Sequence, residues 1–187
     1  FCPWHRDASL RGAEVALVPG GLSYGAYLRS GAIARFSPVM QAVSEHAKAG
    51  GAVVGICNGF QILCEAHLLP GALMRNAGLS FVSKPVDLVV ERTGTVFTSA
   101  FTTGARVRVP VAHGEGQAEF ADATARDACA ASGLVSLRFV DHRGRPTESY
   151  PANPNGSPLG ITGLTSRDGH ATILMPHPER VFRTVQN

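Results

Sequence analysis

The sequence lacks the features that mark a membrane protein or a nucleic-acid-binding protein. Its longest apolar stretches are far shorter than the roughly 20 residues that a membrane-spanning helix requires. Its formal net charge is only +3, and the basic residues are scattered along the chain. No apolar core of a secretory signal follows the N-terminal residues. We therefore expect no membrane and no nucleic acid as partner, and a cytoplasmic location.

Cysteine is also scarce. The four cysteines are widely separated, at Cys2, Cys57, Cys64 and Cys129. Disulfide frameworks are rich in cysteine, and zinc sites usually pair cysteines at short spacing, so four widely spread cysteines favour neither. The sequence also has no G-x-x-x-x-G-K-S/T loop to cradle the phosphates of ATP. We expect no metal and no cofactor on this chain.

What is present is typical of a globular enzyme. Apolar residues make up 44% of the 187 residues and charged residues 17%, which is enough to bury a sizeable core. No repeat or linker interrupts the chain, so we expect one domain over residues 1–187. Periodicity and turn residues predict strands at 14–18, 52–56, 106–111, 134–140 and 171–175, and helices at 38–49, after Cys57 and at 121–132. This order predicts an α/β sandwich around a mostly parallel sheet.

A nucleophile is predicted at Cys57, between a strand and a helix. The segment from Gly55 to Gly59 has the G-x-C-x-G form of a nucleophile elbow, in which glycines permit a strained turn and close packing. The N-terminus of the following helix would favour the thiolate, the form that attacks. The alternative is a buried structural cysteine, which is our interpretation of Cys64 two helical turns later.

A base for the thiol is predicted at His177. It follows the strand 171–175, which would place it at the edge of the same sheet as Cys57, and the prolines on either side restrict its backbone. Glu179 lies two residues further on and is the predicted carboxylate that orients the ring. His113, in the glycine-flanked loop 113–116, is the alternative base.

Donors for a developing oxyanion are predicted at two places. Asn58 follows the nucleophile, and its backbone N–H is one candidate. Gly20 and Gly21 follow another strand and could supply the second donor.

Together these segments resemble the class I glutamine amidotransferases. In that family a Pro-Gly-Gly loop binds the oxyanion, G-x-C-x-G-x-Q carries the nucleophile, and a late His-x-Glu completes a triad. Longer matches resemble the glutaminases of phosphoribosylformylglycinamidine synthases. They are Pro19-Gly-Gly-Leu-Ser-Tyr-Gly25, Cys57-Asn-Gly-Phe-Gln61, Leu69-Pro-Gly-Ala72, Arg75-Asn76, His113-Gly-Glu-Gly116, Asn153-Pro-Asn-Gly-Ser157 and Pro176-His-Pro-Glu-Arg180.

The resemblance implies a flavodoxin-like, three-layer α/β sandwich and hydrolysis of glutamine through a thioester on Cys57. It implies that Gln61 and the loop of His113, Gly114 and Glu115 help to hold the glutamine. Ammonia would pass to an ATP-dependent synthetase subunit or domain in de novo purine biosynthesis. ATP and Mg would belong to that synthetase, and a small bridging subunit is a further candidate partner.

Two features depart from the family pattern. Members usually begin with a strand–helix–strand ahead of Pro-Gly-Gly, and residues 1–13 are too few for it. The N-terminal strand–helix is therefore expected to be shortened. Ala26 stands where the family has an aspartate. Neither departure touches the predicted triad.

Two other functions remain open on the sequence. One is a related hydrolase with an elbow cysteine, such as a protease or deglycase of similar fold. The other is an inactive regulatory subunit, against which the presence of all three triad residues argues.

Overall fold

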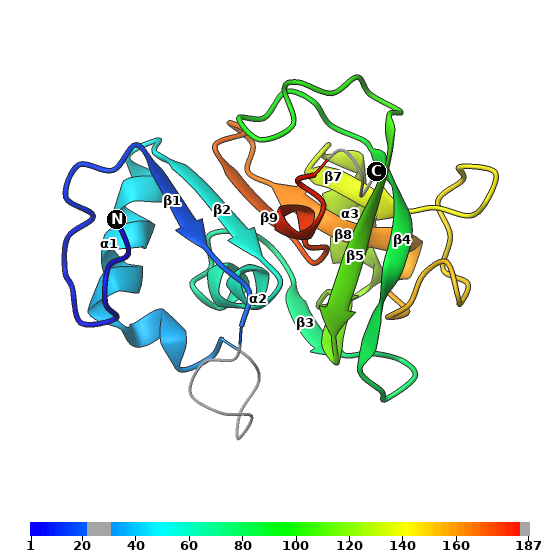
Figure 1. Cartoon of the computed structure of the whole chain (residues 1–187), viewed down its shortest axis with the longest axis horizontal. Coiled ribbons are helices and arrows are strands. Elements are labelled where there is room, and N and C mark those ends of the chain that lie inside the picture. The colour runs from blue at the N-terminus through cyan, green and yellow to red at the C-terminus, as the bar shows by residue number, and fades with distance from the viewer. Residues whose placement is uncertain (22–30, 184–187) are drawn as a thin grey trace.

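The computed structural model describes residues 1–21 and 31–183 (Figure 1). Residues 1–13 form neither a helix nor a strand, which agrees with their being too few for a strand–helix–strand. Ala26 and most of the segment from Pro19 to Gly25 lie outside the described residues.

One half of the molecule is a parallel α/β unit. Its elements are β1 (Val15–Val18), a 3-10 turn η1 (Ala34–Phe36), α1 (Pro38–Lys48), β2 (Ala52–Ile56), α2 (Asn58–Glu65) and β9 (Ala171–Leu174). β1 pairs in parallel with β2, and β2 in parallel with β9. Proline at the first position of α1 suits a helix start, because its missing N–H would have no partner there. The sequence predicted all these strands and both helices to within about two residues of their bounds.

The other half is antiparallel. It contains β4 (Val82–Val90), β5 (Arg106–His113), α3 (Ala123–Ala131), β7 (Val135–Phe139) and β8 (Ile161–Thr165), with the 3-10 turns η2 (Pro158–Gly160) and η3 (Pro178–Arg180). β3 (Ala72–Arg75) and β6 (Glu115–Glu119) form a separate two-stranded sheet. The sequence predicted β5, α3 and β7 but missed β3, β4, β6 and β8. β4 contains Pro85 and β6 contains a glycine and two glutamates, and such residues are rare in strands.

The main sheet is mixed, and the expectation of a mostly parallel sheet was wrong for the described residues. Its seven strands run in the order β1-β2-β9-β8-β7-β4-β5. Two of the six pairings are parallel, and the four from β9 to β5 are antiparallel. The physical reason is connection length. β8 ends at Thr165 and β9 begins at Ala171, and this gap is shorter than the roughly dozen residues that a parallel crossover needs. The α/β class itself is confirmed.

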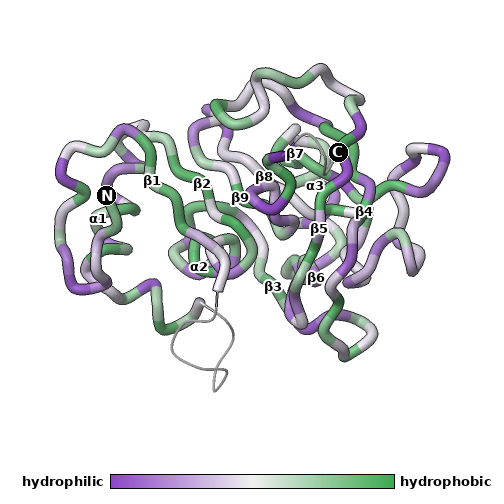
Figure 2. The backbone as a smooth tube through the Cα atoms, viewed as in Figure 1, coloured by the Kyte–Doolittle hydropathy of each residue, from purple (hydrophilic) through white to green (hydrophobic). Residues whose placement is uncertain are grey.

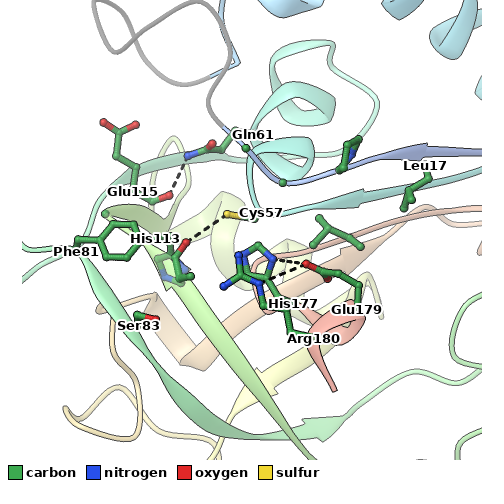
Figure 3. A pocket seen from close by; sticks show the side chains of 16 residues that line it. Leu17, Cys57, Gln61, Phe81, Ser83, His113, Glu115, His177, Glu179 and Arg180 are labelled. Carbon is green, nitrogen blue, oxygen red and sulfur yellow. Dashed lines mark hydrogen bonds and ion pairs between the residues drawn. The ribbon is translucent and has the colours of Figure 1, made fainter. Parts of the chain in front are cut away.

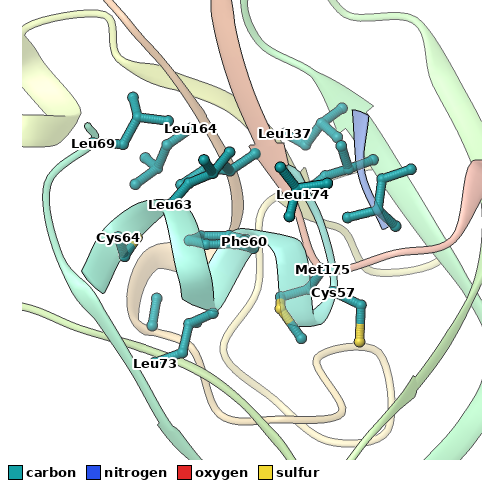
Figure 4. Packing of buried hydrophobic residues seen from close by; sticks show 14 of the residues in the cluster. Cys57, Phe60, Leu63, Cys64, Leu69, Leu73, Leu137, Leu164, Leu174 and Met175 are labelled. Atoms are coloured by element: carbon teal, nitrogen blue, oxygen red, sulfur yellow. The ribbon is translucent and has the colours of Figure 1, made fainter. Parts of the chain in front are cut away.

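Helix α2 lies at the centre of the core. All eight of its residues are buried, and apolar colour follows β1, β2 and α2 in Figure 2. Figure 4 shows Phe60 and Leu63 of α2 among the side chains of Leu174, Met175 and Leu164. Burying a large apolar side chain contributes about 1.5–3 kcal/mol, so this packing fixes α2, and the residue before it, against the sheet.

No helix in the part of the chain that the structure describes is both long and apolar enough to cross a bilayer.

Candidate active site

Cys57 occupies a strained turn between β2 and α2. Its φ of 53° and ψ of −108° lie where residues with a side chain are rarely found. Two glycines make the turn possible. A Cβ on Gly59 would lie 1.9 Å from the carbonyl oxygen of Val18 in β1, and one on Gly55 would lie 2.7 Å from the carbonyl oxygen of Gly59. The backbone at these two positions therefore lies too close to neighbouring backbone for any residue other than glycine. Strain of this kind is typical of functional sites.

The Cys57 side chain is almost fully buried. The residue is 8% exposed, and Sγ lies 3.8 Å from the carbonyl oxygen of Ala112 on β5. Burial raises the pKa of the thiol above its ordinary value of 9.0, and this outweighs the backbone N–H of Asn58 and the charge of Arg180, which both lower it. The helix N-terminus thus favours the thiolate through the N–H of Asn58, as expected, but burial has the larger and opposite effect. The resting thiol is neutral and needs a base.

His177 is paired with a carboxylate. Its Nδ1 lies 2.6 Å from Glu179 Oε1 (Figure 3). Its backbone N–H donates to the carbonyl oxygen of Pro110 at 2.8 Å. Glu179 therefore holds the proton on Nδ1 and leaves the lone pair on Nε2. Nε2 is buried and has no hydrogen-bond partner among the described residues. This is the tautomer that can accept a proton from a thiol.

Gly20 is the point at which the base and the nucleophile meet. A Cβ there would lie 2.9 Å from Cε1 of His177 and 3.3 Å from Cβ of Cys57. The side chains of Cys57 and His177 therefore occupy the space that a side chain at this position would need. Only glycine fits at this point at the end of β1. The sequence brought Gly20 forward as an oxyanion donor, and the structure adds this steric requirement.

These residues line one cavity of about 780 Å³ (Figure 3). Its walls include nearly all the residues predicted for the site: Gly20, Gly21, Cys57, Gln61, His113, Gly114, Glu115, His177 and Glu179. Asn58 is buried directly behind Cys57 at the start of α2. The cavity thus gathers segments from β1, α2, the β5–β6 loop and the end of β9.

Seven lining residues were not among those predicted for the site, and Phe81, Ser83 and Arg180 are the largest or most polar of the seven. Phe81 directly precedes β4 and Ser83 is its second residue, and β4 itself was not predicted. Arg180 is the last residue of the Pro-His-Pro-Glu-Arg segment, which was a signal that could have found it. Its Nε lies 3.8 Å from Glu179 Oε1, and its charge lowers the pKa of the Cys57 thiol.

The loop 113–116 is tied to both halves of the molecule. Gln61 Nε2 of α2 donates to the carbonyl oxygen of Glu115 at 2.9 Å. His113 is 4% exposed, and burial, followed by the charge of His177, lowers its pKa from 6.5 to about 4. The ring is bonded to the amide of Asn155, at 3.1 Å. His113 was the alternative base, but the carboxylate that would orient a base, that of Glu179, is hydrogen-bonded to His177.

Cys64 lies in the core at 4% exposure, as expected. All four cysteines are free thiols. Within residues 1–21 and 31–183, no group of three or more His, Cys, Asp or Glu side chains could hold a metal ion.

Comparison with known proteins identifies the family. Residues 4–187 match the model of the CobB/CobQ-like glutamine amidotransferase domain. The PurQ subunit of phosphoribosylformylglycinamidine synthase from Salinibacter ruber is 54% identical over 97% of this chain and 76% of its own length. The corresponding PurQ subunit from Thermomicrobium roseum is 49% identical over 96% of this chain and 75% of its own.

Solved structures agree with this assignment. A chain in the structure of PurLQS from Thermotoga maritima has a TM-score of 0.79 and 38% identity, over 96% of this chain and 75% of that one. The glutaminase domain of the Trypanosoma brucei CTPS, solved with acivicin, has a TM-score of 0.59 at 13% identity, over 94% of this chain and 67% of that one, and shares the fold.

Proposed function

The chain belongs to the CobB/CobQ-like glutamine amidotransferase family, and we propose that it is the glutaminase component of a phosphoribosylformylglycinamidine synthase. In this role it hydrolyses glutamine to glutamate and ammonia, and the ammonia serves purine biosynthesis. One observation carries the proposal for the site. Cys57 lies in a strained turn, and His177, oriented by Glu179, lies beside it. Both side chains are adjacent to Gly20 in one cavity.

The reaction uses Cys57 as nucleophile. Nε2 of His177 takes the thiol proton as Sγ attacks the γ-carboxamide carbon of glutamine. The developing oxyanion is stabilised by the backbone N–H of Asn58 and by the Gly20–Gly21 loop. The proton then passes from His177 to the departing nitrogen, which leaves as ammonia, and a γ-glutamyl thioester remains on Cys57. His177 next takes a proton from water, which attacks the thioester, and the release of glutamate restores the thiol.

Glu179 acts through His177. Its carboxylate fixes the tautomer and stabilises the imidazolium that forms in each half of the reaction. Burial raises the pKa of the Cys57 thiol, which favours the neutral thiol and gives His177 the role of taking its proton during the attack. Gln61 and the loop from His113 through Gly114 to Glu115 hold the glutamine in the cavity.

The partner that we propose is an ATP-dependent synthetase subunit or domain. A chain of this kind is present in the related structure of PurLQS from Thermotoga maritima. ATP and Mg belong to the synthetase, and this chain supplies no cofactor; a small bridging subunit completes the proposed assembly. We place the reaction in the cytoplasm, where four free thiols are stable.

The test is glutamate production from glutamine by the whole chain. It is measured alone, and again with a synthetase, its nucleotide and its acceptor. We expect a low rate alone and about 5- to 150-fold activation in the complex, which corresponds to a coupling of roughly 1–3 kcal/mol. Equal rates in both would favour a stand-alone hydrolase. No glutamate in either would favour an inactive regulatory subunit.

A further inference from the structure

A buried polar cluster holds the ring of His113 on the side away from solvent. Asn155 comes from the loop between β7 and β8 and is fully buried. Its Nδ2 lies 3.1 Å from Nε2 of His113 and 2.7 Å from the carbonyl oxygen of Gly116. The ring is also tightly confined, because a Cβ on Gly116 would lie 2.2 Å from Cδ2 and 2.4 Å from Nε2 of His113.

The orientation of the Asn155 amide is fixed by neighbours whose roles are unambiguous. Its Oδ1 accepts from the backbone N–H of Ser157 at 3.0 Å and from the Ser157 hydroxyl at 2.7 Å. A backbone N–H can only donate, so the oxygen of the amide must face Ser157. Nδ2 therefore faces Gly116 and His113.

The same reasoning fixes the proton of His113. The carbonyl oxygen of Gly116 can only accept, so it takes one hydrogen of Nδ2, and the second hydrogen points at Nε2 of His113. An N–H on Nε2 would oppose this hydrogen, donor against donor. Nε2 therefore carries the lone pair, and the proton of the neutral ring is on Nδ1.

Nδ1 is the ring nitrogen that this arrangement leaves with a proton to donate. It is buried and has no hydrogen-bond partner among the described residues. A buried donor without an acceptor is destabilising, and such groups in native structures usually have a functional reason. His113 lines the cavity that contains Cys57 and His177. With its pKa lowered to about 4, the ring stays neutral at physiological pH.

We propose that Asn155 is a positioning residue: it locks His113 in the Nδ1–H tautomer, so that this N–H donates to an oxygen of the glutamine bound in the cavity. The inference rests on the proposed glutaminase function for the identity of the ligand. The tautomer itself does not depend on that function, so the two can fail separately.

The first experiment measures the tautomer of the whole wild-type chain without substrate. Histidine ring ¹⁵N shifts are recorded by NMR, and the signal of His113 is assigned by its loss in His113→Gln. We expect a protonated Nδ1 and an unprotonated Nε2. A protonated Nε2 in the wild-type chain would overturn the proposal, whatever the enzyme activity.

The second experiment exchanges the donor for an acceptor with Asn155→Asp. The carboxylate would accept from Nε2, so we expect His113 to be protonated on Nε2 and to titrate at a higher pH than in the wild type. The kcat/KM for glutamine, measured with the synthetase partner, should fall on the order of tenfold or more through the loss of one buried hydrogen bond to substrate. A KM effect should dominate, because the Cys57–His177 pair is untouched.

The matched control is Asn153→Asp. Asn153 is also a buried amide in this loop, and its side chain makes three hydrogen bonds, to Thr147, Ser157 and Gly156, none of which involves His113. It should leave the tautomer and the pH profile unchanged. Equal losses of kcat/KM in the two variants, with the wild-type tautomer kept in both, would show that Asn155 is merely structural. Should Asn155→Asp not fold, Asn155→Ala is measured, and a mixed tautomer is expected.

Discussion

The elbow and the His113 cluster face each other across one cavity, but the chain specifies them in opposite ways. The elbow is a single short stretch, residues 55–61, whose strained turn is held by close packing of glycine against backbone. The His113 cluster joins Asn76, loop 113–116 and loop 153–157, which are far apart in the sequence, through hydrogen bonds of buried amides. Local strain thus positions the reacting atom, and long-range polar contacts shape the wall that faces it.

The largest effect should come from the reacting atom itself. Cys57→Ala removes the nucleophile, and we expect glutamate turnover in the complex to fall on the order of 10⁴-fold or more. Cys64→Ala is the matched control, since it deletes a buried thiol of α2, the helix that follows Cys57, and this thiol lies in the core. It should lose stability and keep its activity within a few fold. Alkylation by a glutamine analogue should label Cys57, and a label on Cys64 instead would contradict the assignment.

The next effect separates the base from its orienting carboxylate. His177→Ala should be nearly as damaging as Cys57→Ala, because the triad acts as a unit. Glu179→Gln should cost less, up to about 10⁴-fold, because the amide can still hydrogen-bond to the ring although it no longer fixes the tautomer. Turnover of both variants is compared with that of His113→Ala. A greater loss in His113→Ala than in His177→Ala would make His113 the base.

The His113 cluster should be visible in the pH dependence of stability. The pKa of His113 is about 4 in the folded state against an ordinary 6.5, so the unfolded state binds more protons between these values. This contribution to stability is fully present above pH 6.5 and is lost as the pH falls toward 4. It amounts to about 3 kcal/mol. The free energy of unfolding is measured with urea at several pH values between 4 and 6.5. It should rise less steeply with pH in His113→Gln than in the wild type, and an equal rise in both would contradict the assignment.

The smallest effect tests the packing of the elbow. Gly59→Ala places a Cβ against the carbonyl oxygen of Val18, and we expect a loss of about 2–3 kcal/mol of stability, from denaturant unfolding. Gly94→Ala is the control, because a Cβ there meets nothing within 4 Å. It should change the free energy of unfolding by less than about 0.5 kcal/mol. Similar losses in both would mean that close packing does not hold the elbow.

The parallel half of the fold could be predicted, and much of the antiparallel half could not. Strands 52–56 and 171–175 are short, continuous apolar runs bounded by turn residues, which is a local signal. β6 contains Glu115, Gly116 and Glu119 and is a strand only because β3 pairs with it. The same holds for β8, whose pairing with β9 decides its direction. Strand pairing of this kind depends on tertiary context more than on local preference.

The candidate catalytic residues Cys57, His177 and Glu179 could be predicted from the sequence. A strained elbow and a proline-bounded strand end demand particular residues in a row, and such demands are visible without a structure. Gly20 was also visible, but not its steric role between Cys57 and His177.

The protonation of Cys57 and of His113, and the contacts that hold His113 in the cavity wall, could be decided only from the tertiary structure. Whether a thiol is neutral depends on how much water surrounds it, and burial raises the pKa of Cys57 against the effect of the helix N-terminus. The tautomer of His113 depends on Asn155, 42 residues away along the chain. The sequence by itself determined which groups could react, because local geometry constrains residue type. The fold determined their protonation, because desolvation and long-range hydrogen bonds exist only once distant segments meet.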